Sequence, residues 1–180
     1  TNALTPSSIV GASNVVCTTQ DAQDKDVDTT SSMATDDITA GTLATATFAT
    51  ATDTPGFESV ATVSFTTAGR VEVGGKVKLV MPDEAGAQHS WRFADNKNPS
   101  VETDGTNNPP AIAFTTPGAN APTAGTVGYT VNTRTLIFTV GDNDLKQATA
   151  HVFTVTNALT PSSIVGASNV VCTCLLYTSP

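Results

Sequence analysis

An exact internal repeat constrains this chain more than any other sequence feature. Residues 1–18 (TNALTPSSIVGASNVVCT) recur letter for letter as residues 156–173, so each residue of the first copy returns 155 positions further along. A period of this length is too long for a solenoid coil or a propeller blade, and it fits one whole globular domain. We therefore expect a string of near-identical domains, of which this chain holds one period and the opening of the next.

The repeat also suggests domain boundaries. We expect residues 1–7 to end the preceding repeat or form a linker, residues 8–158 to form the domain, and residues 159–173 to form the next linker and first strand. Identity stops after residue 173, where Cys174 stands in the place of Thr19. The tail 174–180 resembles a translated sequencing adapter and is then not native, although a divergent terminal repeat is the alternative.

Alternating apolar and polar residues predict strands rather than helices. About one residue in six is Thr, well above the usual share, whereas Leu, Glu, Lys and Arg are scarce. Period-two alternation and turn residues predict an all-β domain, and residues 20–37 read as a polar loop with at most a short extended piece. The expected strands are residues 8–18, 42–52, 59–66, 76–81, 89–93, 111–115, 125–132, 134–140 and 148–156. Several short strands separated by turns favour a two-sheet β-sandwich with Greek-key connections.

Charge argues against two classes of partner. The net charge is −8 and the isoelectric point is about 4.4, with eight basic residues in the whole chain. So few cations cannot build the positive surface that nucleic acid or an anionic membrane attracts. There is also no apolar run near the length that a membrane span needs, so we expect no membrane insertion in this segment. Such acidity suits a hydrated polymer whose partners are copies of itself.

Two segments resemble the immunoglobulin-like sandwich repeats of very large surface and fibre proteins of microbes and protists. They are ESVATVSFTTAGRVEVGGKVKLVMPDEAG (residues 58–86) and RTLIFTVGDNDLKQATAHVFTVTNALTPSS (residues 134–163). In each such repeat a strand leads to a Gly-Gly turn, and a last strand like FTVTN runs into a Pro/Ser linker. The resemblance covers about half of the chain. It implies an immunoglobulin-like fold and an extracellular structural role.

The junction between repeats is the first candidate functional feature. The expected junction residues are Thr156, Asn157, Leu159, Pro161 and Ile164. Pro161 fixes φ and stiffens the connection, which favours a rod or fibre over freely flexing domains. A strand such as residues 164–173 leaves unpaired backbone groups when its own domain is missing, so it can complete the sheet of a neighbouring domain by strand donation.

A single cysteine in each repeat cannot close a disulfide within its own domain. Cys17 and its copy Cys172 lie in the apolar segment SNVVCT. Two interpretations stay open: a disulfide that joins repeats or chains, or a reduced thiol buried as a small apolar side chain.

An acidic run offers a candidate cation site. Asp24, Asp26 and Asp28 alternate along the chain, and carboxylates spaced in this way can converge on Ca²⁺. The EF-hand pattern is not present, and a solvated acidic loop is the alternative. Asp142 and Asp144 form a second, weaker cluster. No other cofactor is expected.

No motif indicates catalysis. The two histidines, His89 and His151, have no accompanying nucleophile motif, so we expect that the protein is not an enzyme. Trp91, Phe93 and Tyr129 can either stack on a sugar or anchor the core, and we expect the core. The abundant Thr and Ser residues suit O-glycosylation of an exposed fibre, although exposed strand Thr needs no sugar to explain it.

These features together predict an extracellular, cell-surface structural protein. We expect a repeat subunit of a filament, flagellar hair or surface stalk, built from tandem copies of one β-sandwich. The alternative is an adhesin-type repeat that presents loops to a partner surface or a glycan. A long uniform array favours the filament, and a short array that ends in a different domain favours the adhesin.

Overall fold

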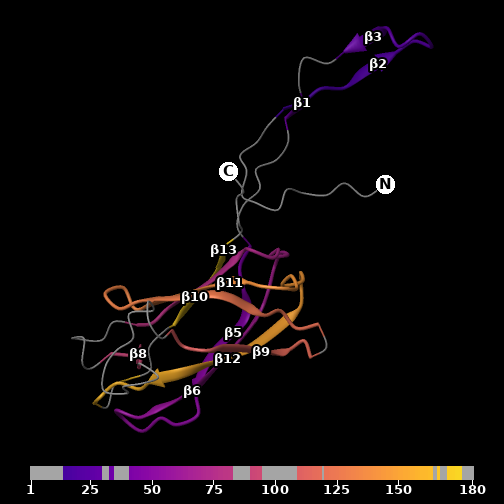
Figure 1. The fold of residues 1–180 in the computed structure, drawn as a ribbon. Helices are drawn as coiled ribbons and strands as arrows, with labels where there is room; N and C mark the ends of the chain where they lie inside the picture. Colours follow the sequence, from indigo (N-terminus) through magenta and orange to yellow (C-terminus); the bar gives the residue numbers. More distant parts are fainter. Residues whose placement is uncertain are drawn as a thin grey trace. The chain divides into compact units, whose positions relative to one another are not determined.

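The chain forms two compact units, which are considered separately. A computed structural model describes residues 14–29, 33–34, 41–82, 90–94, 109–118, 120–163, 166 and 170–175 (Figure 1). One unit is Thr1–Ala40 and the other is Gly41–Pro180. The described residues form strands and turns without a helix, which confirms the all-β prediction. Accordingly, none of them belongs to a helix long and apolar enough to cross a membrane.

The first unit contains two short antiparallel pairs. Strand β1 (Asn14–Val15) pairs with β4 (Met33–Ala34), and β2 (Thr18–Gln20) pairs with β3 (Asp26–Thr29). Residues 20–37 were expected to form a loop with at most a short extended piece, and two short strands, β3 and β4, lie within that range. Their side chains are polar or exposed, so hydrophobic alternation could not reveal them. Residues 8–13 of the first predicted strand lie outside the described residues.

The second unit contains a five-stranded antiparallel sheet. Its central strand, β12 (Ala150–Leu159), pairs with β6 (Glu58–Thr66) on one side and with β8 (Arg92–Phe93) and β9 (Ile112–Thr116) on the other. Strand β5 (Ala44–Thr50) pairs with the free side of β6. The predicted strands 59–66 and 148–156 correspond to β6 and β12, although β12 continues three residues further.

A four-stranded antiparallel sheet completes the second unit. Its order is β10 (Ala124–Thr130), β11 (Thr135–Val140), β7 (Lys76–Val80) and β13 (Val171–Leu175). The first three strands match predicted strands to within two residues at each end. The first three residues of strand β13 belong to the second copy of the repeated segment, and their pairing with β7 places the end of that copy in the four-stranded sheet.

One hydrophobic core joins the two larger sheets. Alternate residues of β6 and β12 are buried, and so are alternate residues of β7 and β11, so each sheet turns one apolar face inward. The Phe153 ring of one sheet lies 5.2 Å from the Phe138 ring of the other, and the two meet edge to face. Phe114 packs 5.2 Å from Phe153 as well. This face-to-face packing makes the unit sandwich-like.

Strand register places the beginning and the end of the second unit at the same pole. Ala44, the first residue of β5, lies opposite Thr66, and Leu175, the last residue of β13, lies opposite Lys76. Because residues 66 and 76 flank one connection, the chain enters and leaves the unit beside it. Figure 1 shows β5 and β13 converging there. We call this end the chain-entry pole and the opposite end the distal pole.

Two loops interlock at the chain-entry pole. Val71 and Leu145 exchange backbone hydrogen bonds of 2.9 Å, and both side chains are buried. The Asp144 carboxylate accepts a hydrogen bond of 2.9 Å from the Arg70 Nε and another of 2.9 Å from the Val73 N–H. These contacts hold the connection between β6 and β7 against the connection between β11 and β12.

Candidate functional site

The repeated segment contributes two parts of the sandwich-like unit. Its first residues form the end of β12, and its last residues form most of β13. The segment therefore crosses from the five-stranded sheet to the four-stranded sheet. We take the contacts of the second copy as the candidate functional site, because its sequence is the one that the chain repeats.

The end of β12 is fixed by hydrogen bonds to Ala94, the residue after β8. Asn157 has a φ of 61°, in the left-handed region that Asn tolerates better than most residues, and it lies at a β-bulge. Asn157 makes two hydrogen bonds with Ala94: the Ala94 N–H donates to the Asn157 carbonyl oxygen at 2.8 Å, and Asn157 Nδ2 donates to the Ala94 carbonyl oxygen at 3.3 Å. Both residues are buried. These two reciprocal hydrogen bonds fix the backbone at the β-bulge.

The next residues are fixed to the connection between β5 and β6. Pro161 is buried, and its carbonyl oxygen accepts a hydrogen bond of 2.8 Å from the Gly56 N–H. Gly56 has a φ of 66°, which favours glycine at this turn. Of the expected junction residues, Thr156, Asn157, Leu159 and Pro161 thus lie within the sandwich-like unit, and Ile164 lies outside the described residues.

Strand β13 binds the edge of β7 in a regular antiparallel register. Val171, Cys172 and Thr173 lie opposite Val80, Leu79 and Lys78. Val171 is 54% exposed and Thr173 is exposed, whereas Val170, Cys172 and Cys174 are half-buried against the core. The strand therefore turns alternate small side chains inward, as its sequence alternation requires.

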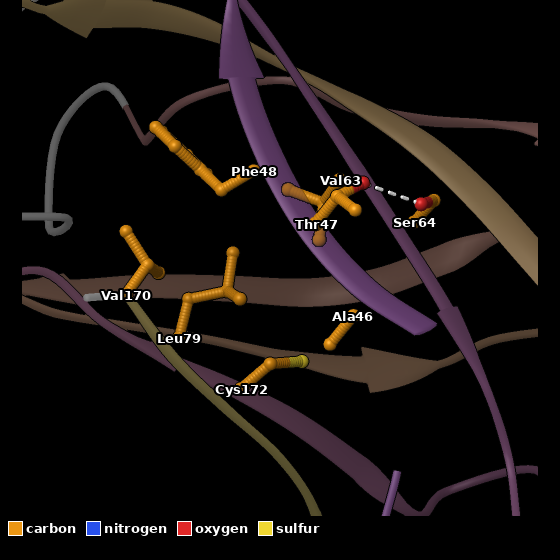
Figure 2. Close-up of a pocket in the computed structure, with 8 residues that line it drawn as sticks. All are labelled: Ala46, Thr47, Phe48, Val63, Ser64, Leu79, Val170 and Cys172. Atoms are coloured by element: carbon orange, nitrogen blue, oxygen red, sulfur yellow. Dashed lines mark hydrogen bonds between the residues drawn. The ribbon is translucent and has the colours of Figure 1, made fainter. Parts of the chain in front are cut away.

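A cavity of about 180 Å³ lies beneath β13, where the two sheets face each other (Figure 2). Cys172 and Val170 lie on one side of it with Leu79, and Phe48 and Val63 lie on the other. On β5 and β6, Thr47 Oγ1 and Ser64 Oγ share a hydrogen bond of 2.6 Å. The full lining is Ala46, Thr47, Phe48, Val63, Ser64, Leu79, Val170 and Cys172. The lining side chains of β5, β6 and β7 form a seat of mixed polarity beneath the inward face of β13.

Burial controls the chemistry of the thiols at this seat. It raises the pKa of Cys172 to about 12 and that of Cys174 to about 12, the latter with a further contribution from Cys172. Both thiols are thus protonated at neutral pH and unreactive as nucleophiles. Cys17, the copy of Cys172 in the first unit, is exposed. The disulfide and burial interpretations of Cys17 and Cys172 both remain predictions.

The two copies of the repeated segment have different partners. In the second copy, residues 171–173 pair with β7; in the first, Val15 pairs with Met33 and Thr18 pairs with Thr29. The sequences are identical, so the difference comes from which partner strands are present. The first unit has no strand equivalent to β7 among its described residues.

The acidic hairpin of the first unit uses its carboxylates for local hydrogen bonds. Asp26 Oδ1 accepts from Gln20 Nε2 at 2.9 Å, and Asp28 Oδ2 accepts from Thr19 Oγ1 at 3.2 Å. Asp24 lies in the turn with a φ of 60°. Within the described ranges, no three His, Cys, Asp or Glu side chains are grouped so as to hold a metal ion. The calcium site at Asp24, Asp26 and Asp28 stays a prediction.

The aromatic residues considered for sugar stacking lie in or against the core. Phe93 and Tyr129 are buried, with ring centroids 5.2 Å apart, and half-buried Trp91 packs edge to face on Phe48 at 5.8 Å. His151 is fully buried against Phe65, and its Nδ1 has no hydrogen-bond partner. Burial lowers the pKa of His151, although the carbonyl oxygen of Lys146 raises it in part. His89 lies outside the described residues.

Sequence reasoning did not identify the edge of β7 as a binding site. The strand itself was predicted, but period-two alternation cannot tell a central strand from one with an open edge. The Gly56 turn and the Ala94 pair were missed as well, because backbone partners far apart in sequence leave no local pattern. The repeat itself is the signal that could have found the site. Its last residues alternate as in a strand, and a strand needs a partner edge.

Comparison with known proteins adds no relative. No protein-family model, no curated protein and no solved structure matches the chain.

Proposed function

We propose that this chain is a non-catalytic structural repeat of an extracellular filament, flagellar hair or surface stalk. The observation that carries the proposal is the place of the repeated segment in the fold. The second copy contains the end of β12 and most of β13, which close one sandwich-like unit, and the first copy has the same sequence. A chain with successive copies of this segment therefore supports a series of such units.

We further propose that each unit is an immunoglobulin-like sandwich with Greek-key connections. The resembling segments support this proposal, because residues 58–86 include β6, the Gly-Gly turn and β7, while residues 134–163 include β11 and β12. Strand β12 also lies between β6 and the pair β8 and β9, so strands distant in sequence become neighbours. Such crossovers between two sheets are typical of Greek-key sandwiches.

The chain-entry pole suggests how successive units are joined. Because residues 44 and 175 lie at the same pole, the spacer between two units is the segment equivalent to residues 20–43 rather than residues 156–161. Each sandwich is then joined to the spacers before and after it at its chain-entry pole. The contacts of Asn157 and Pro161 strengthen each unit from within.

The proposal is tested with a concatemer, a chain of three consecutive 155-residue periods. Residues 156–173 follow the last period and supply the closing strands of the last unit. Pulled in a force microscope, the concatemer should unfold in equal steps, since residues 44–175 extended at about 3.4 Å per residue give roughly 400–450 Å each. Negative-stain images should show evenly spaced particles. An antibody against the unit should label intact source cells. Irregular steps, or labelling only after permeabilisation, would contradict the structural, extracellular role.

An adhesin-type repeat is the second candidate, favoured by Phe57. This side chain is 53% exposed on the connection between β5 and β6 at the distal pole, although its backbone is fixed by Thr160. An exposed aromatic ring on a rigid loop can stack on a sugar. A glycan array probed with the full chain tests this role: binding that Phe57→Ala abolishes supports the adhesin, and an array without binding leaves the filament.

A further inference from the structure

The edge of β7 recognises a short segment with a simple pattern. Val171, Cys172 and Thr173 pair with it through the backbone, and the inward-facing Cys172 sits against Leu79 over the cavity. Binding to this edge therefore requires small side chains at the positions that face inward, whereas the identity of the outward-facing side chains matters little. Any strand with the same alternation and sequence fits this edge in the same way.

The first unit contains a segment with the same sequence as this strand. Residues 14–18 are identical to residues 169–173, so Cys17 corresponds to Cys172 and Thr18 to Thr173. In its present place the segment is poorly buried, since Val16 is 60% exposed and Cys17 is exposed. Its β1 portion pairs with β4 over only two residues. So short a pair is weakly held in water.

We propose that residues 14–18 form a closing strand for a second copy of this sandwich. The segment docks antiparallel on the β7 edge of that copy, where β13 lies in this one, with Cys17 opposite Leu79 and Thr18 opposite Lys78. The inference deepens the proposed function and rests on it. In a tandem chain the second copy is the preceding repeat, and between separate chains it is another molecule that exchanges strands.

The docked segment would gain burial and would exchange its present backbone partners, β4 and Thr29, for the edge of β7. Its inward-facing position becomes as buried as Cys172, and the next inward position, Cys174 in the second copy, is Thr19 in the first. Both are small enough for the seat. The exchange also replaces a two-residue pairing with one at least as long as residues 171–173 on β7. Chains that carry a surplus strand would then link to one another.

The test begins with the full chain carrying Val170→Asp and Cys172→Asp. These substitutions put carboxylates at the half-buried positions beneath β13, which should release it from β7 and leave the edge open. The N-terminal segment of another molecule should then bind there. Light scattering after size exclusion should show dimers and larger species that grow with concentration, and alkylation of Cys17 should slow at least tenfold.

Two control variants test whether assembly depends on the inward-facing side chains of β13 and on the N-terminal segment. Val171→Asp with Thr173→Asp adds the same charge at the exposed positions of β13 and should remain monomeric like the unaltered chain. Adding Val15→Asp and Cys17→Asp to the released variant should abolish its assembly. If the released variant is folded and monomeric, with Cys17 alkylated at an unchanged rate, the proposal is wrong.

A second measurement covers the case in which the released variant does not fold. Lys78→Cys and Thr18→Cys are introduced into a chain whose three natural cysteines are replaced by Ser, with β13 otherwise intact. Because Lys78 lies opposite Thr173, transient exchange of β13 for residues 14–18 of another molecule would bring the two new thiols together across the strands, where oxidation traps them. Oxidation should then give a ladder of linked chains several-fold faster than in a control with Asp53→Cys in place of Thr18→Cys.

Equal rates of linkage in these two chains would overturn the strand-docking proposal. That result would leave the proposed function intact, because the concatemer can still unfold in equal steps when the junction is only a spacer. Conversely, rapid linkage with irregular unfolding steps would support strand docking and contradict the filament. The two proposals therefore fail separately.

Discussion

Phe57 and Thr160 are joined by reciprocal hydrogen bonds. The Phe57 N–H donates to Thr160 Oγ1 at 2.9 Å, and the Thr160 N–H donates to the Phe57 carbonyl oxygen at 3.1 Å. The Thr160 hydroxyl donates in turn to the carbonyl oxygen of Thr54 at 2.5 Å. Thr160 is 2% exposed, so one buried hydroxyl fastens the repeated segment to the connection between β5 and β6.

Replacing Thr160 by Val should therefore destabilise the unit. The substitution keeps the shape of the side chain but removes the hydroxyl, leaving the Phe57 N–H and the Thr54 carbonyl oxygen without it. We expect a loss of about 1–3 kcal/mol in the free energy of unfolding, measured by urea denaturation. Thr160→Ser keeps the hydroxyl and is the control. Equal losses in both variants would show that the methyl group matters rather than the hydrogen bonds.

The stability of the unit should fall as the pH drops below about 6.5. Burial lowers the pKa of His151 in the folded state, so the unfolded chain takes up its proton first as the pH falls. The contribution of the neutral imidazole is complete above the unfolded pKa and is lost as the pH falls from there to the folded pKa. The maximum slope is about 1.4 kcal/mol per pH unit.

This pH dependence is measured by urea denaturation between pH 8 and pH 5 in a His89→Gln background, where His151 is the remaining histidine. His151→Leu is the comparison, and its stability should change much less across the same range. A slope that persists in the His151→Leu chain would assign the effect to other groups.

The three cysteines should differ in their reaction with iodoacetamide. Cys172 and Cys174 have pKa values raised to about 12 by burial from an ordinary 9.0, which lowers their thiolate fraction roughly a thousandfold relative to the unfolded chain. Cys17 is exposed and should be modified first. Peptide mass spectrometry at successive times gives the three rates. Similar rates at all three positions in the folded chain would contradict the seat described for β13.

Substitution of Phe153 should lower the free energy of unfolding more than substitution of most other core residues. It is fully buried and packs against Phe138 across the two sheets, so Phe153→Ala removes contacts from both and leaves a cavity. We expect a loss of about 3–5 kcal/mol in the free energy of unfolding. Phe57→Ala, at a half-exposed ring, is the control and should cost much less. The calorimetric midpoint of thermal unfolding reports both, and a small shift for Phe153→Ala would argue against a shared core.

Much of the second unit could be predicted from local sequence. Alternation in residues 58–66 and 135–140 identified strands that bury every second side chain, because apolar burial on one face requires that period. The hairpin of β2 and β3 was missed, since its strands pair through polar groups such as Thr19 and Asp28 and have no apolar face. The extension of β12 to Leu159 was missed because the bulge at Asn157 interrupts the alternation.

The sequence by itself determined that the protein is all-β and that one segment is repeated without change. Only the tertiary structure decided where each copy of that segment packs, since Cys17 is exposed in one copy and Cys172, on β13, is half-buried over the cavity in the other. The physical reason is that a strand's backbone groups are satisfied by whichever edge is within reach, and side-chain alternation only selects the face that turns inward. Identical residues therefore pair with β4 and β3 in one place and with β7 in the other.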